Sequence, residues 1–185
     1  RKRFLVQKPY TITASINDRH IWRGWQTGRM NAAWGGISDD KEISICVSES
    51  HKTTENILKK GTFTVSMADV DHMTAAIMWE LFPENKEPDK FAKAGFTAEK
   101  SEKVDAPIIK ELPICVECKL KSYDKETCRL VGEIVNVSVD ERVLDKNGNV
   151  DVVKAAPITF DPFNNAYIRL GEKGGDAFKA GAALK

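Results

Sequence analysis

The residues of this chain that could do chemistry gather in two short stretches, and the first leads into the start of a predicted helix. It is a run of hydroxyl, imidazole and ammonium side chains: Ser48, Ser50, His51, Lys52, Thr53 and Thr54. The N-terminus of a helix presents unpaired backbone N–H groups and a partial positive charge, so this stretch suits a bound anion such as a phosphate. A capped helix beside a solvated loop histidine explains the same residues without a ligand.

The second stretch is a corner of small residues around one tryptophan. It comprises Asn31, Ala32, Ala33, Trp34 and Gly35. Small side chains let a backbone approach an aromatic plane closely, and the indole of Trp34 can pack beside such a plane. The alternative is a tight strand-to-loop corner around a core tryptophan.

The cysteines and histidines do not form a metal or catalytic motif. Cys115 and Cys118 are spaced as C-x-x-C, but they lie in a predicted strand, where an odd separation points them to opposite faces. A zinc site would also need a second pair of ligands at suitable spacing. We therefore expect structural cysteines, no metal site and no acid–base triad, with His72 as a polar surface residue.

Hydrophobic periodicity predicts strands over most of the chain. They cover residues 43–48, 63–67, 114–122, 128–140, 157–160 and 166–170. Strict alternation over 128–140 places Leu130 on one face and Val137 and Val139 on the other. Neither face of this strand is purely polar, which suits a strand in a closed barrel.

Helical patterns are short and peripheral. They predict helices over residues 53–60, 71–81 and 89–94. The first has Ser50 as its N-cap, Ile57 and Leu58 on its apolar face, and Gly61 as its C-terminal stop. Together with the strands, these helices predict a mainly β fold, a β-barrel with peripheral helices, as one domain over residues 1–185.

Length and composition limit the classes of protein to consider. The chain has 185 residues, 42% of them hydrophobic, and a formal net charge of +1, which argues against a nucleic-acid binder. No apolar run approaches the roughly 20 residues of a membrane span. The N-terminal stretch lacks the apolar core of a signal peptide, and the four cysteines are too scattered for a disulfide framework. We expect a cytoplasmic protein that acts on a small molecule.

Ordered motifs along the chain resemble the flavin reductase-like family, and more closely its flavoredoxin branch. They are residues 30–38 (MNAAWGGIS), 48–54 (SESHKTT), 88–96 (PDKFAKAGF), 106–107 (AP), 112–113 (LP), 117–119 (ECK), 132–134 (GEI) and 167–171 (YIRLG). No single motif is decisive, but their order and spacing together are fairly specific. The resemblance covers most of residues 30–175.

The resemblance implies an FMN-binding split β-barrel. It assigns residues 31–35 to the lining of the flavin and 48–54 to its phosphate, while Lys90 and Phe160 match family positions near the flavin. It further implies a homodimeric flavoprotein oxidoreductase that passes hydride or electrons through FMN to an acceptor. The donor would be NAD(P)H or a redox partner protein. Because the flavin carries the redox chemistry, no side chain is assigned as catalytic.

Two other functions remain open alongside this one. The first is an FMN electron carrier with little NAD(P)H activity. The second is a split-barrel binding module that holds no flavin. Flavin absorbance would exclude the second, and bleaching by NADH or NADPH without oxygen separates an enzyme from a carrier.

Residues 11–29 and 77–84 depart from the family pattern. The first segment is rich in Arg and Trp where the family has a strand, a Gly/Asp turn and a second strand. Back-translation of residues 14–29, read one base later, yields QVLMIGTYGEDGRPE, an apolar strand followed by an Asp-Gly turn. Residues 77–84, read with the preceding base, yield the family-like DYVGIVSG. We hypothesise that both segments are out-of-frame translations; the alternative is ordinary divergence, helped by the free choice of synonymous bases.

Overall fold

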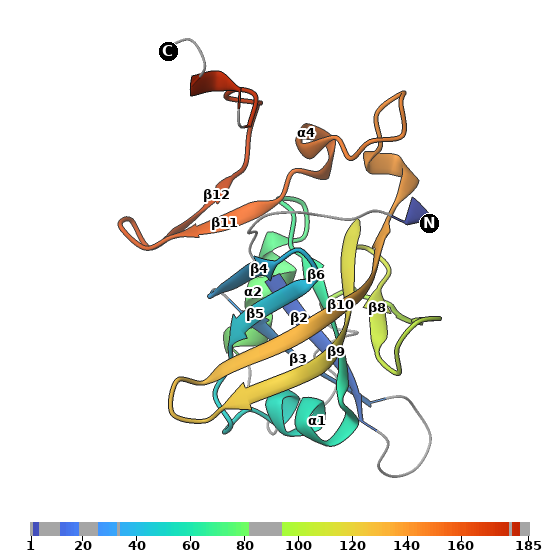
Figure 1. Ribbon diagram of the computed structural model, residues 1–185, viewed down its shortest axis with the longest axis vertical. Helices are drawn as coiled ribbons and strands as arrows, with labels where there is room; N and C mark the ends of the chain where they lie inside the picture. The colour runs from blue at the N-terminus through green and yellow to red at the C-terminus, as the bar shows by residue number, and fades with distance from the viewer. Residues whose placement is uncertain are drawn as a thin grey trace.

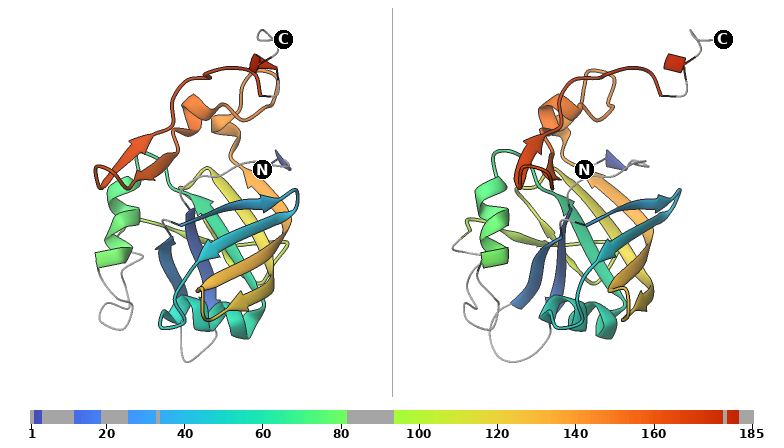
Figure 2. Two further views of the ribbon diagram at one scale, coloured as in Figure 1. Left: turned by 60° about the vertical axis from the view of Figure 1, so that its left-hand side comes forward. Right: turned by 90° about the vertical axis from the view of Figure 1, so that its left-hand side faces the viewer.

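An antiparallel sheet of eight strands, counted over the described residues, curls into a barrel (Figures 1 and 2). The structure is a computed structural model that describes residues 2–3, 12–18, 26–32, 34–81, 94–177 and 179–181. The strands run in the order β3, β2, β6, β9, β10, β5, β4, and β1 also pairs with β10. Their bounds are β1 (Lys2–Arg3), β2 (Ile12–Asp18), β3 (Gln26–Ala32), β4 (Gly35–Asp39), β5 (Glu42–Cys46), β6 (Thr62–Met67), β9 (Ile114–Asp124) and β10 (Arg129–Val139).

Short helices and two small hairpins surround the barrel. The helical elements are α1 (Lys52–Lys60), α2 (Met73–Leu81), the 3-10 helix η1 (Glu141–Val143) and α4 (Val152–Ala155). The hairpins pair β7 (Ala98–Lys100) with β8 (Pro107–Ile109), and β11 (Ile158–Asp161) with β12 (Ala166–Arg169). Helix α1 lies at one end of the barrel and the β11–β12 hairpin at the other (Figure 1). This architecture confirms the predicted mainly β fold with peripheral helices.

The barrel core is built from the strands that alternation predicts. In β5, Ile43 and Ile45 are buried while Ser44 between them is half-buried. The pattern in β6 differs, because all residues from Phe63 to Met67 are buried. Strand β6 lies between β2 and β9 and is also contacted by α1 and β8, so both of its faces are covered.

Helix α1 forms where its sequence predicts it, but its N-cap and one residue of its predicted apolar face differ from the prediction. Gly61 is its C-cap and adopts φ 68°, a left-handed conformation that favours glycine. The N-cap is His51 rather than Ser50. Leu58 is 40% exposed, so the buried face is carried by Ile57 and by polar neighbours in the first two turns.

Strict alternation over 128–140 is wrong because β10 contains a bulge. Val135 is an extra residue between two register positions of the β9–β10 pair. Such an insertion exchanges the two faces of the strand beyond it. Val137 and Val139 therefore lie in the same core as Leu130.

The remaining helix predictions fall partly outside the described residues. The predicted helix 71–81 is observed as α2, which begins at Met73. The predicted helix 89–94 lies outside the described residues except for Ala94. Strands β2 and β3 pair from Ile12↔Ala32 to Asp18↔Gln26, so the described backbone has the two paired strands that the resemblance implies for this region.

Candidate functional site

Trp34 and Gly35 form a corner between β3 and β4 that packs directly on β5. The carbonyl of Trp34 accepts a 2.9 Å hydrogen bond from the N–H of Cys46, and Gly35 lies opposite Ile45. A Cβ added at Gly35 would lie 2.6 Å from Cγ2 of Ile45 and 2.8 Å from the carbonyl oxygen of Ser44. Close packing of β4 on β5 therefore explains why this residue is a glycine. The close approach of a ligand is not needed to explain it.

An aromatic cluster covers this corner. Trp34 is 59% exposed, and its ring centroid lies 6.0 Å from that of Phe160 at an interplanar angle of 77°. Phe160 in turn contacts Tyr167, with ring centroids 5.7 Å apart. A tryptophan this exposed at a packed corner offers a flat apolar surface to a partner ring.

Trp34 and Phe160 were both expected near the flavin on the basis of the resemblance, and the structure brings them together. Tyr167 was not expected there. The signal that could have found it is the register of the β11–β12 hairpin, in which Tyr167 lies opposite Phe160. Cross-strand neighbours on one face of a hairpin pack side by side.

The loop before α1 carries a pair of exposed hydroxyl groups. The hydroxyl oxygens of Ser48 and Ser50 lie 2.9 Å apart, and the N–H of Ser50 donates to Ser48 Oγ at 3.3 Å. His51 follows as the N-cap, but its side chain makes no capping hydrogen bond. The backbone N–H groups of the first helical turn thus have no side-chain acceptor from the N-cap.

The two threonines of the first turn are more enclosed than the sequence suggests. Thr53 is 2% exposed and Thr54 is fully buried. The hydroxyl of Thr54 has no hydrogen-bond partner in the described structure. A buried hydroxyl without a hydrogen-bond partner costs free energy. A ligand oxygen that accepts a hydrogen bond from the Thr54 hydroxyl would remove that cost and so favour binding.

Lys52 brings a positive charge to the same turn, but a carboxylate accompanies it. Lys52 Nζ lies 2.9 Å from Glu55 Oε2, and Lys59 also forms an ion pair with Glu55. Hydrogen bonds from Lys59 and Lys52 lower the pKa of Glu55 to about 2. Glu55 is thus ionised across the neutral range and shares the charge of Lys52 with any bound anion.

The aromatic corner and the hydroxyl loop lie at the same end of β5. Cys46, the last residue of that strand, bonds the carbonyl of Trp34, and Ser48 is only two residues further along the chain. Tyr123 holds the intervening residue, since its hydroxyl donates to the carbonyl of Val47 at 3.0 Å. Hydroxyl, backbone N–H and ammonium donors suit a phosphate, and an exposed indole suits a flat ring. The residues present therefore fit FMN.

The remaining predicted site residues are placed less completely. Asn31 and Ala32 lie at the end of β3, opposite Thr13 and Ile12 of β2. Ala33 and Lys90 lie outside the described residues.

The two cysteines of the C-x-x-C motif lie in the protein interior. Cys115 and Cys118 are both thiols, and both are fully buried on β9. Burial raises the pKa of the Cys118 thiol well above its usual value, so this thiol is protonated and unreactive at neutral pH. Over the ranges that the structure describes, no three His, Cys, Asp or Glu side chains are grouped to hold a metal ion. None of the helices in those ranges has the length and apolar character of a membrane span.

The fold is that of the split-barrel class of flavin reductase-like proteins. Residues 31–155 match the family model described as "Flavin reductase like domain", and the chain belongs to this family.

Solved structures agree with the assignment. Flavoredoxin of Desulfovibrio vulgaris (Miyazaki F) is 31% identical and superposes with a TM-score of 0.84 over 97% of this chain and 96% of its own. An FMN-binding domain of a flavin reductases-like enzyme from Shewanella baltica OS155 has the same fold, with a TM-score of 0.78 and 16% identity over 90% of this chain and 88% of that chain.

A curated relative covers a shorter region. An uncharacterized protein of Aquifex aeolicus (strain VF5) is 36% identical over 109 residues, which are 57% of this chain and 55% of that protein. The chain thus spans about half the length of this relative.

Proposed function

We propose that this protein is an FMN-binding flavoprotein oxidoreductase that passes hydride or electrons from NAD(P)H through FMN to an acceptor. Membership of the flavin reductase-like family supports the flavin, and the solved relative from Shewanella baltica is itself described as FMN-binding. The observation that carries the proposal is the arrangement at the end of β5. There the exposed ring of Trp34 and the hydroxyls of Ser48 and Ser50 lie at the same end of the strand.

The chain's own residues bind and orient the cofactor. Ser48, Ser50 and the first N–H groups of α1 donate hydrogen bonds to the phosphate, and Lys52 adds positive charge. Trp34 and Phe160 pack against the flat ring and exclude water from one side of it. When bound, FMN supplies the hydride or electron transfer, and the protein supplies position and electrostatics.

The proposal includes a homodimer, which exposed apolar side chains of the β11–β12 hairpin support. Phe163 at the tip of the β11–β12 hairpin is 94% exposed, and Ile168 on β12 is 49% exposed. A second copy that packs on the hairpin would cover this apolar surface. Sedimentation velocity of the wild type and of Phe163→Asp tests this: a dimer that the variant weakens agrees with the proposal, and a monomeric wild type contradicts it.

Titration of the protein with FMN tests the main proposal. We expect quenching of flavin fluorescence with a one-to-one end point. The double variant Ser48→Ala/Ser50→Ala should bind FMN at least about tenfold more weakly, because it loses hydrogen bonds to a charged group. Ser122→Ala, a change of an exposed serine on β9, is the matched control and should leave the affinity unchanged. Protein that takes up no FMN would overturn the proposal.

The electron donor is tested on the FMN-loaded protein without oxygen. NADH or NADPH should bleach the flavin absorbance, and the spectrum should return when an acceptor is added. Retention of FMN without bleaching by either nucleotide would contradict the use of NAD(P)H and leave an electron carrier as the function.

A further inference from the structure

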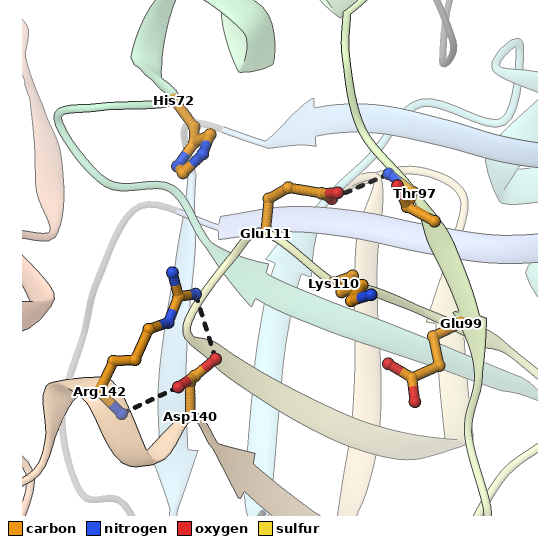
Figure 3. Close-up of a pocket in the computed structure, with 7 residues that line it drawn as sticks. All are labelled: His72, Thr97, Glu99, Lys110, Glu111, Asp140 and Arg142. Carbon is orange, nitrogen blue, oxygen red and sulfur yellow. Dashed lines mark hydrogen bonds and ion pairs between the residues drawn. The ribbon is translucent and has the colours of Figure 1, made fainter.

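A polar cleft of about 490 Å³ lies beside the barrel, and none of its residues belongs to the flavin site (Figure 3). Its walls come from four separate parts of the chain: His72 just before α2, Thr97 and Glu99 around the start of β7, Glu111 after β8, and Asp140 and Arg142 around η1. Clefts of this size accommodate small molecules.

His72 is held rigidly at one wall of the cleft. Its Nδ1 lies 2.7 Å from Oδ1 of Asp69, which also accepts the backbone N–H of His72 at 2.8 Å. The ring lies against Phe96, with centroids 5.7 Å apart. The contact with the buried Asp69 carboxylate fixes the orientation of the imidazole, and because Nδ1 is bonded to Asp69, Nε2 is the ring nitrogen left for a ligand.

Arg142 provides donors to the same cleft. Its Nη2 lies 3.1 Å from Asp140 Oδ2, and Oδ1 of Asp140 accepts its backbone N–H at 2.9 Å. Asp140 thus orients the guanidinium, which is 68% exposed as a side chain and carries five N–H donors in all. Figure 3 shows the guanidinium beside Asp140, with His72 across from it on the wall above.

Glu111 adds an oriented carboxylate. Its Oε2 accepts the backbone N–H of Thr97 at 2.8 Å, which holds the side chain across the cleft (Figure 3). Two cations, Lys110 and Arg142, line the cleft together with three carboxylates, Glu99, Glu111 and Asp140. A carboxylate of the ligand is attracted by the cations and an ammonium group by the carboxylates, whereas a ligand with one charge meets only one of these two sets favourably. The lining therefore favours a ligand that carries both.

We propose that this cleft is a second binding site, for a small zwitterion with an ammonium group and a carboxylate separated by a short chain. The carboxylate binds the guanidinium of Arg142, where a planar fork of donors matches its two oxygens. The ammonium group donates to the carboxylate of Glu111, which lies beside His72 in the cleft (Figure 3). This site rests on side chains outside the flavin site, so it does not depend on the proposed oxidoreductase activity.

An NMR titration of the full chain tests the site, with the His72 imidazole resonances as the readout. The probe is 4-aminobutanoate, and butanoate and butylamine are matched controls that carry one charge each. We expect a saturable shift with 4-aminobutanoate and affinity at least about tenfold above either control. No saturable shift, or equal affinity for a singly charged control, would overturn the proposal.

Substitutions locate the binding within the cleft. Arg142→Gln and Glu111→Gln should each weaken the probe about fivefold or more, and Glu111→Gln keeps an oxygen that can accept from Thr97. Arg129→Gln, which removes a cation bonded to Ser44 on the barrel wall, should have no effect. If Arg142→Gln does not fold, Glu111→Gln decides, and unchanged affinity in that variant contradicts the site. An FMN titration at saturating probe should give an unchanged FMN affinity, so failure of flavin binding and failure of this site are distinguishable.

Discussion

Gly132→Ala should destabilise the protein through one contact in the barrel core. A Cβ at Gly132 would lie 2.4 Å from Cζ and 2.8 Å from Cε1 of Phe63, and 3.3 Å from Cβ of Cys118. The ring of Phe63 is fully buried, so it cannot turn into solvent. Overpacking of this kind costs about 1–3 kcal/mol. We expect a loss of about 2–3 kcal/mol in the free energy of unfolding, because the overlap involves a ring inside a close-packed core.

A double-mutant cycle isolates that contact. Phe63→Leu alone should cost about 1–2 kcal/mol through lost apolar burial. In Phe63→Leu/Gly132→Ala the new methyl group enters space that the ring vacated, so the double variant should lose at least about 1 kcal/mol less than the sum of the single changes. Urea unfolding followed by circular dichroism gives the four free energies. Gly171→Ala, whose Cβ would meet nothing within 4 Å, is the control and should stay within about 0.5 kcal/mol of wild type. A harmless Gly132→Ala, or strict additivity in the cycle, would refute the contact.

Three further predictions follow from other features. The pKa of Glu55 is lowered from 4.5 to about 2, so its ion pairs stabilise α1 fully at pH values above 4.5 and are lost as the pH falls through about 2. Lys59→Gln should raise the Glu55 titration midpoint measured by carbon NMR, because it removes one of the two ion pairs. Gly35→Ala should lower the melting temperature and weaken FMN binding, since its Cβ would displace Ile45; thermal unfolding and FMN titration check this, and an unchanged protein would contradict it. If a sequencing error caused the out-of-frame segments, peptide mapping of the protein from its native source should yield no peptides matching residues 14–29; finding them would refute a sequencing error and leave compensating insertions and deletions or divergence.

The barrel was predictable because its strands carry local signals. Alternation in residues 43–48 marks β5, and Ile43 and Ile45 are buried as expected. The bulge at Val135 was not predictable from the sequence. Valines on both sides of Asn136 give the same apolar pattern whether or not the strand contains an extra residue. The N-cap shifted from Ser50 to His51 for a related reason: both residues precede the helix, and only the backbone conformation decides between them.

The site was predictable only where a local motif existed. Trp34 and the serines before α1 stand in short patterns with a chemical meaning, and the structure places them at one end of β5. Phe160 was found through family resemblance, since nothing near it in sequence indicates that it meets Trp34. The polar cleft had no sequence signal, because its residues come from four parts of the chain and converge only in the folded barrel.

The β11–β12 hairpin forms a sheet of its own and is not a strand pair of the eight-stranded sheet. The start of β11 and the residues before it bond to the segment that follows β6: the N–H of Val70 donates to the carbonyl of Ala156 and the N–H of Ile158 to the carbonyl of Ala68, each at 3.1 Å. A hairpin attached in this way can change in length or sequence without altering the register of any barrel strand. Because Phe160 and Tyr167 belong to it, evolution could replace one wall of the ring surface by a local insertion or deletion, and leave the phosphate end of the site intact.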